Sequence, residues 1–157
     1  DLASLILSFF GDFTNTDLPI SFKDTENSII EQTFLLKDVL TVIDDFHPSN
    51  KTDEQNLTKN AQTIMRSYGD RIGKNRLKSD STLMSAKPPR GNAILTGEMA
   101  PDISESGTAR YITVELKKGD INTEKLTKLQ ELAREGIFKS IMSVYIRDLY
   151  FYIYNES

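Results

Sequence analysis

A run of five apolar or β-branched residues, Val-Leu-Thr-Val-Ile at positions 39–43, constrains the fold of this chain most strongly. The run lacks alternation between polar and apolar residues, which is typical of a strand buried on both faces. Helical periodicity precedes it at residues 25–37 and follows it at residues 52–68, where Thr52 and Gln55 predict a capping box. Strands that alternate with helices predict an α/β fold with a mainly parallel sheet flanked by helices.

The rest of the chain adds shorter strands and a long C-terminal helical region. In chain order, the further expected elements are a helix over residues 1–10 that ends at Gly11, a strand over 18–22, strands over 93–96 and 111–116, and a helical region from about residue 122 to near the end with an interruption at Gly136. Thr25 is expected to cap the helix that follows it. We therefore divide the chain into a sheet-containing core, residues 1–120, and a helical segment, residues 121–157.

Composition excludes several kinds of site. The 157 residues contain no Cys and a single His, His47, so a disulfide scaffold, a thiolate metal site and a multi-His metal centre are all excluded. No apolar run approaches the roughly 20 residues that span a bilayer, and no basic segment precedes an apolar stretch as in a signal peptide. We therefore expect a cytoplasmic protein with no membrane partner.

Two carboxylates, Asp44 and Asp45, directly follow the apolar run of residues 39–43. In an open α/β sheet, ligands gather outside the carboxyl ends of the strands. Two carboxylates at such a position can hold Mg²⁺ and orient an attacking water, as in the Walker B motif of nucleoside triphosphatases. The structural alternative is a turn or a helix cap, since Asp often follows a strand in that role.

Further polar residues stand at comparable positions along the chain. Thr96 and Glu98 lie where the strand predicted at residues 93–96 ends, and they could contact a γ-phosphate and a water unless they only form a turn. Arg110 precedes the next predicted strand; it either reaches a phosphate across a subunit boundary as an arginine finger or is an ordinary surface residue. His47 either approaches a ligand or faces solvent.

Charge is concentrated in residues 66–90. This segment carries seven basic residues against two acidic ones, a net charge of +5, whereas the whole chain has a net charge of −4. A basic segment is typical of phosphate binding, either on nucleic acid or on a nucleotide. The candidate contacts are Arg71, Lys74, Arg76 and Lys78, which could line a DNA channel or reach a neighbouring subunit's nucleotide. The alternative is a solvated loop.

The order of these features along the chain is similar to that in a known group of proteins. The chain resembles the ATPase region of primase–helicase-like proteins of phages and mobile elements, which are related to AAA+ and superfamily 3 helicases. The matching stretches are residues 37–46, 68–76, 89–98 and 109–111. The resemblance implies a partial P-loop NTPase core of AAA+ or RecA-like type, ATP and Mg²⁺ as cofactors, DNA as partner and a homo-oligomeric ring.

The same resemblance implies roles for individual residues. Asp44 and Asp45 would handle Mg²⁺ and water, Thr96 and Glu98 would sense the γ-phosphate, and Arg110 would act on the neighbouring subunit's nucleotide. No G-x-x-x-x-G-K-[ST] phosphate loop is present to supply the missing Ser/Thr metal ligand.

The helix that begins at Asp1 is similar to the one that would follow such a loop, so we expect a chain cut just downstream of Walker A. We expect this chain alone to bind ATP poorly and to be inactive. It would be a fragment of a DNA-dependent ATPase that acts in replication of a phage or mobile element; the alternative is a non-catalytic nucleic-acid-binding or assembly module on a P-loop-like scaffold.

Overall fold

A computed structural model describes residues 2–13, 18–73, 81, 83, 85–103 and 109–155 of the chain. These residues belong to two compact units, which are described separately below. One unit is the continuous stretch Pro19–Val114 and contains the sheet; the other combines Asp1–Leu18 with Glu115–Ser157. The N-terminal helix thus groups with the C-terminal helices, whereas the sequence division assigned it to residues 1–120.

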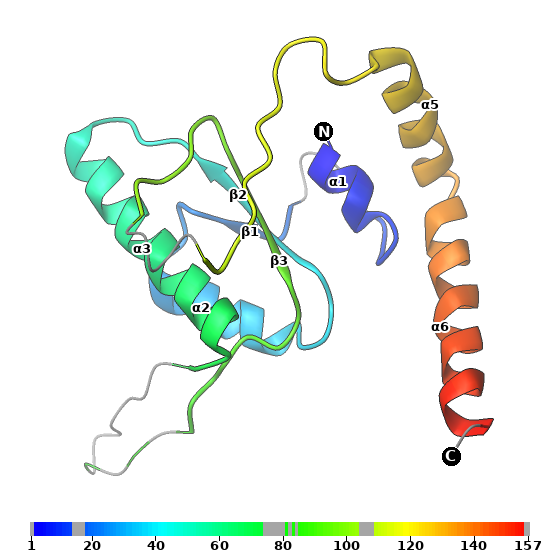
Figure 1. Cartoon of the computed structure of the whole chain (residues 1–157), viewed down its shortest axis with the longest axis horizontal. Coiled ribbons are helices and arrows are strands. Elements are labelled where there is room, and N and C mark those ends of the chain that lie inside the picture. Colours follow the sequence, from blue (N-terminus) through cyan, green and yellow to red (C-terminus); the bar gives the residue numbers. More distant parts are fainter. Residues whose placement is uncertain are drawn as a thin grey trace. The chain divides into compact units, whose positions relative to one another are not determined.

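The Pro19–Val114 unit is built on three parallel strands in the order β1-β2-β3 (Figure 1). The strands are β1 (Ile20–Ser21), β2 (Thr41–Phe46) and β3 (Ala93–Gly97), with helix α2 (Glu26–Leu35) between the first two and α3 (Lys51–Asp70) after the second. This arrangement confirms the predicted α/β class and the parallel sheet.

Strand register explains why one apolar cluster joins both helices to the sheet. Ile20 pairs with Ile43, which in turn pairs with Leu95, so these three side chains share one face. The cluster comprises Ile20, Phe22, Ile29, Ile43, Phe46, Leu57, Ala61 and Ile64. It contains residues of α2 and α3 together with the central strand, and this packing positions the carboxyl ends of the strands.

The N-cap residue was predicted correctly for α2 and wrongly for α3. Thr25 caps α2 as predicted, its hydroxyl accepting a hydrogen bond from a backbone N–H of the first turn. The capping box predicted from Thr52 and Gln55 is wrong, because α3 begins earlier, at Lys51. Asn50 is the N-cap, and its side-chain oxygen accepts from the Asp53 N–H at 2.9 Å. Asn is among the residues most strongly preferred at the N-cap, which explains why Asn50 and not Thr52 caps this helix.

Two strand predictions also need correction. β2 runs over Thr41–Phe46, so the acidic pair lies within the strand and does not follow it. The strand predicted over residues 111–116 is wrong, since residues 111–117 contain no helix or strand, and Ile112 and Val114 are 91% and 74% exposed. The β-branched composition of this stretch favours a strand, but among the described residues no neighbouring strand pairs with it.

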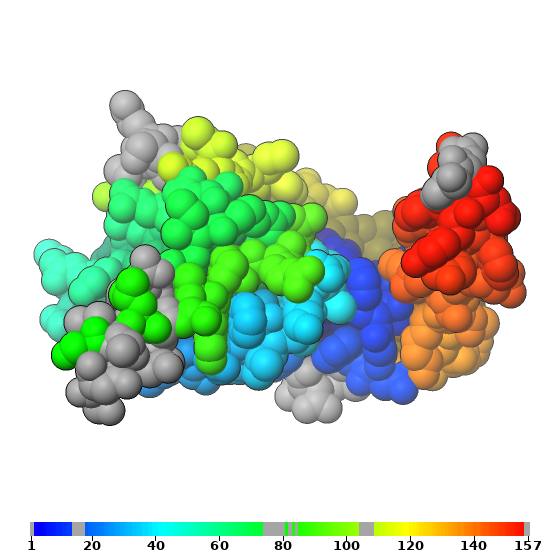
Figure 2. All heavy atoms as spheres, turned by 90° about the horizontal axis from the view of Figure 1, so that it is seen from below, coloured from blue at the N-terminus to red at the C-terminus, as the bar shows by residue number. Residues whose placement is uncertain are grey.

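The second unit is helical. It contains α1 (Leu2–Leu7), α5 (Thr123–Arg134) and α6 (Ile137–Asn155), and the predicted interruption at Gly136 is confirmed by its φ of 77°. The rings of Phe9 and Phe138 stack at a centroid distance of 4.8 Å, which joins the segment after α1 to α6. Much of α6, orange to red in Figure 2, is apolar and exposed, including Ile146 and Tyr150 at 55% and 54%.

Candidate functional site

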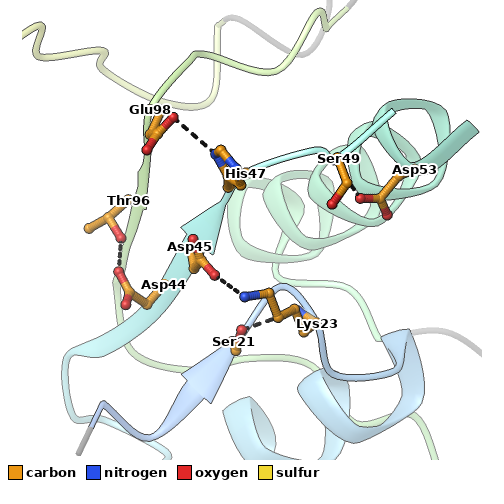
Figure 3. A network of polar contacts seen from close by, with 9 residues as sticks. All are labelled: Ser21, Lys23, Asp44, Asp45, His47, Ser49, Asp53, Thr96 and Glu98. Atoms are coloured by element: carbon orange, nitrogen blue, oxygen red, sulfur yellow. Dashed lines mark hydrogen bonds and ion pairs between the residues drawn. The ribbon is translucent and has the colours of Figure 1, made fainter. Parts of the chain in front are cut away.

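Thr96 and Asp44 meet at the carboxyl end of the sheet. Val42 pairs with Ile94 in the β2–β3 register, and two residues further along each strand the side chains return to the same face. The Thr96 hydroxyl donates a hydrogen bond to an Asp44 carboxylate oxygen (Figure 3). The structure therefore brings together two of the residues that the sequence analysis selected from separate strands.

Asp45 occupies an unusual backbone position next to Asp44. Its φ is 68°, in the left-handed region, and the β2–β3 register shifts between Ile43 and Phe46. Asp tolerates this conformation better than most residues, whereas β-branched residues do not. Successive side chains of a strand point to opposite sides, and the two carboxylates diverge: Asp44 points to β3, and Asp45 points to the loop after β1 (Figure 3).

Gly97 makes this register shift, a β-bulge, possible. It stands opposite Phe46 in the register, and a Cβ atom at position 97 would lie 2.7 Å from both the Cβ and the carbonyl oxygen of Phe46. Ordinary contacts between such atoms are longer by roughly 1 Å. The glycine therefore allows β3 to approach β2 at the point where Thr96 meets Asp44.

Lys23 contributes a positive charge that the sequence analysis missed. Its ammonium group lies 2.5 Å from an Asp45 carboxylate oxygen, and the two side chains are 73% and 40% exposed. The hydrogen bond and the charge of Asp45 raise the pKa of Lys23 above its ordinary value. A signal was available, because Lys23 follows a predicted strand closely, as the acidic pair does.

His47 and Glu98 form a second polar contact at the same end of the sheet. The His47 Nδ1 atom lies 3.0 Å from a Glu98 carboxylate oxygen, with the side chains 50% and 78% exposed (Figure 3). His47 follows β2 and Glu98 follows β3, so this contact joins the two strand ends. Glu98 thus lies near the acidic pair but is directed toward His47 and not toward Thr96.

The structure places Arg71 and Arg110 away from this cluster. The Arg110 Nε donates to Asp70 at 2.8 Å, and the Arg110 side chain packs against Gly69 at the C-terminal end of α3. Arg71 donates to the carbonyl oxygen of Arg90 at 2.8 Å, just before β3 begins. Both arginines therefore lie toward the amino ends of the strands, and within one chain neither approaches the acidic pair.

The remaining basic residues of the segment 66–90 fall into two groups, those outside the described residues and those paired within the chain. Lys74, Arg76 and Lys78 lie outside the described residues. Elsewhere in the basic segment, Lys87 contacts Glu31 at 2.5 Å, and Arg90 lies 3.6 Å from Asp38. The described charges of this segment are thus engaged in large part by acceptors of the chain itself.

The donor set limits what metal this site could hold. Among the described residues, no group of three or more His, Cys, Asp or Glu side chains is arranged to bind a metal ion. Mg²⁺ is usually held by one or two carboxylates together with phosphate oxygens and water. Asp44 and Asp45 alone therefore do not form an all-protein metal cage.

Comparison with protein-family models, with curated proteins and with solved structures finds no match to this chain. As for the membrane, no helix within the described ranges combines the length and apolar character that a crossing requires.

Proposed function

We propose that this chain supplies the acidic half of an ATP-hydrolysis site in a DNA-dependent, helicase-like ATPase of a phage or mobile element. One observation carries the proposal: polar side chains of two neighbouring parallel strands, Asp44 and Thr96, meet at the carboxyl end of the sheet. This is where ligands bind in open α/β sheets. Asp45, His47 and Glu98 add ionisable side chains at the same end of the sheet.

In this proposal Asp44 and Asp45 position Mg²⁺ and the attacking water, while Thr96 and Glu98 respond to the γ-phosphate. The phosphate-binding loop would come from chain outside the present sequence. The edge of β3 away from β2 is unpaired among the described residues, and a parallel strand added there would end beside Thr96. Arg110 would act on the nucleotide of a neighbouring subunit in a ring, which agrees with its distance from its own acidic pair.

The decisive experiment measures ATP hydrolysis by a protein extended upstream through a phosphate-binding loop. Asp45→Asn should lower turnover by about 10²–10⁴-fold while nucleotide binding persists, because the carboxylate orients water and metal but does not cradle the phosphates. Asp38→Asn is the matched control, since Asp38 is an exposed carboxylate before the same strand. Equal turnover in Asp45→Asn, or robust turnover by the 157-residue chain alone, contradicts the proposal.

The alternative function, a nucleic-acid-binding or assembly module, depends on Lys74, Arg76 and Lys78. Replacing Lys74 and Arg76 by Ala should weaken single-stranded DNA binding equally across sequences, and it should reduce the log–log salt slope by about one for each phosphate that the protein no longer neutralises. If these side chains serve a neighbour's nucleotide, the salt slope stays constant and ATP turnover falls.

A further inference from the structure

A cavity lies within the helical unit, between α1 and α5. Its volume is about 340 Å³, near the lower end of the range for small-molecule pockets. All the residues that line it belong to this one unit. On the side of α1 and the segment after it, the lining includes Leu5, Ser8 and Phe13; on the α5 side it consists of Gln130, Ala133 and Arg134.

Two free hydrogen-bond donors of this cavity belong to α5. Gln130 and Arg134 are four residues apart, so their side chains lie on one face of the helix. Neither side chain has a hydrogen bond or an ion pair with another residue that the structure describes. Across the cavity, the Ser8 hydroxyl already donates to the Leu5 carbonyl oxygen at 2.6 Å. A ligand with acceptor oxygens would therefore bind them toward α5.

The charges that line the cavity favour an anionic ligand. Asp12 lines the cavity too, but its carboxylate is paired with the Lys139 ammonium group at 2.6 Å. Arg134 is therefore the lining charge that lacks a counter-ion among the described residues. A guanidinium group pairs with a carboxylate through two parallel hydrogen bonds, and the amide of Gln130 can donate a third. A single unpaired positive charge matches a monoanion better than a phosphate dianion.

We propose that this cavity binds a small organic carboxylate. The carboxylate group pairs with Arg134 and Gln130, and the apolar body of the ligand packs against Leu5, Phe13 and Ala133. Small-molecule sites commonly combine an apolar lining with a few polar groups that fix the orientation of the ligand. This inference goes beyond the proposed function and does not depend on it, because no residue of the cavity belongs to the unit that contains the sheet.

The test adds benzoate or benzamide to the 157-residue chain and follows the backbone amide signals of Leu5, Gly11 and Ala133 by NMR. The two probes have the same shape, but only benzoate is charged. Benzoate should bind in the millimolar range, because so small a ligand makes few contacts. It should bind about three- to tenfold more tightly than benzamide, the range between an exposed ion pair and a hydrogen bond to a charged group.

Three variants separate the charge of the site from its space. Arg134→Gln should lower the affinity for benzoate to that for benzamide and leave benzamide binding unchanged. Lys128→Gln is the matched control, since Lys128 is an exposed cation on the same helix that does not line the cavity. Ala133→Leu should weaken binding of both probes, because the larger side chain fills part of the cavity. Circular dichroism checks that each variant keeps its helices.

Tighter binding of benzoate than of benzamide, lost in Arg134→Gln and kept in Lys128→Gln, supports the proposal. If both probes bind the unmodified chain equally, if benzoate keeps its advantage in Arg134→Gln, or if inorganic phosphate binds more tightly than benzoate, the carboxylate site is refuted. If neither probe shifts the three amide signals, or if Ala133→Leu binds both as tightly as the unmodified chain, the cavity takes no ligand and the proposal fails. None of these outcomes affects the role proposed for Asp44 and Asp45.

Discussion

Replacement of Gly97 by Ala should destabilise the protein through a single added methyl group. The Ala Cβ would lie 2.7 Å from the Phe46 Cβ and carbonyl oxygen, so β3 has to move outward by several tenths of an ångström or more. One of these neighbours is backbone and Phe46 is 2% exposed, so neither gives way easily. Overpacking of this kind costs about 1–3 kcal/mol. The movement should also lengthen the hydrogen bond between Thr96 and Asp44.

Urea and thermal unfolding measure this cost. For a domain of this size, each kcal/mol shifts the melting temperature by about 2–4 °C, so we expect a decrease of about 4–8 °C for a cost near ~2 kcal/mol. Met99→Ala is the control, since Met99 is exposed two residues later and should change stability by less than about 0.5 kcal/mol. If Gly97→Ala melts at the same temperature as the unmodified chain, the close approach of β3 to the bulge does not exist.

Three further predictions concern backbone strain, titration and surface. Asp45→Ala should lower the free energy of unfolding in urea by about 1–2 kcal/mol while Asp45→Gly lowers it less, because φ is 68° there; equal decreases would refute the left-handed conformation. Burial raises the pKa of Tyr68 above 10.0, so its contribution to stability is present below about pH 10 and is lost as the pH rises through the folded-state pKa. We expect the urea midpoint of unfolding to fall as the pH rises above 10, and to fall less in Tyr68→Phe. An absorbance titration of the folded chain should show one tyrosine that ionises at a higher pH than the others. Ile146→Lys combined with Tyr150→Lys should reduce binding of a hydrophobic dye at unchanged helicity, since both side chains lie exposed on α6.

Local sequence patterns predicted the elements that depend on burial alone. The run at residues 39–43 predicted a buried strand, and Val42 and Ile43 are fully buried in β2, whereas Val39 precedes the strand and is 37% exposed. The interruption at Gly136 followed from the conformational freedom of glycine near a helix end. Local patterns failed at residues 111–116, because a β-branched stretch forms a strand only where a partner strand is available.

The candidate site was predictable to the extent that sheet geometry is general. Parallel strands end on the same side, so the meeting of Asp44 with Thr96 followed from two strand predictions. The Asp45–Lys23 pair did not follow, because it requires the pairing of β1 with β2 and the turn after β1. Arg110 is remote from the acidic pair for a similar reason: its position depends on Asp70 in α3, not on the strand predicted after it.

The sequence by itself determined the α/β class, the parallel sheet and the end of the sheet at which the polar residues gather, because these depend on patterns of burial within short segments. Only the tertiary structure decided which charge faces which. Asp44 and Asp45 are neighbours in sequence, yet one contacts β3 and the other contacts the loop after β1. The physical reason is that neighbouring side chains of a strand point to opposite sides, while the partners that they meet there depend on the pairing of β2 with β1 and β3, segments distant in the chain.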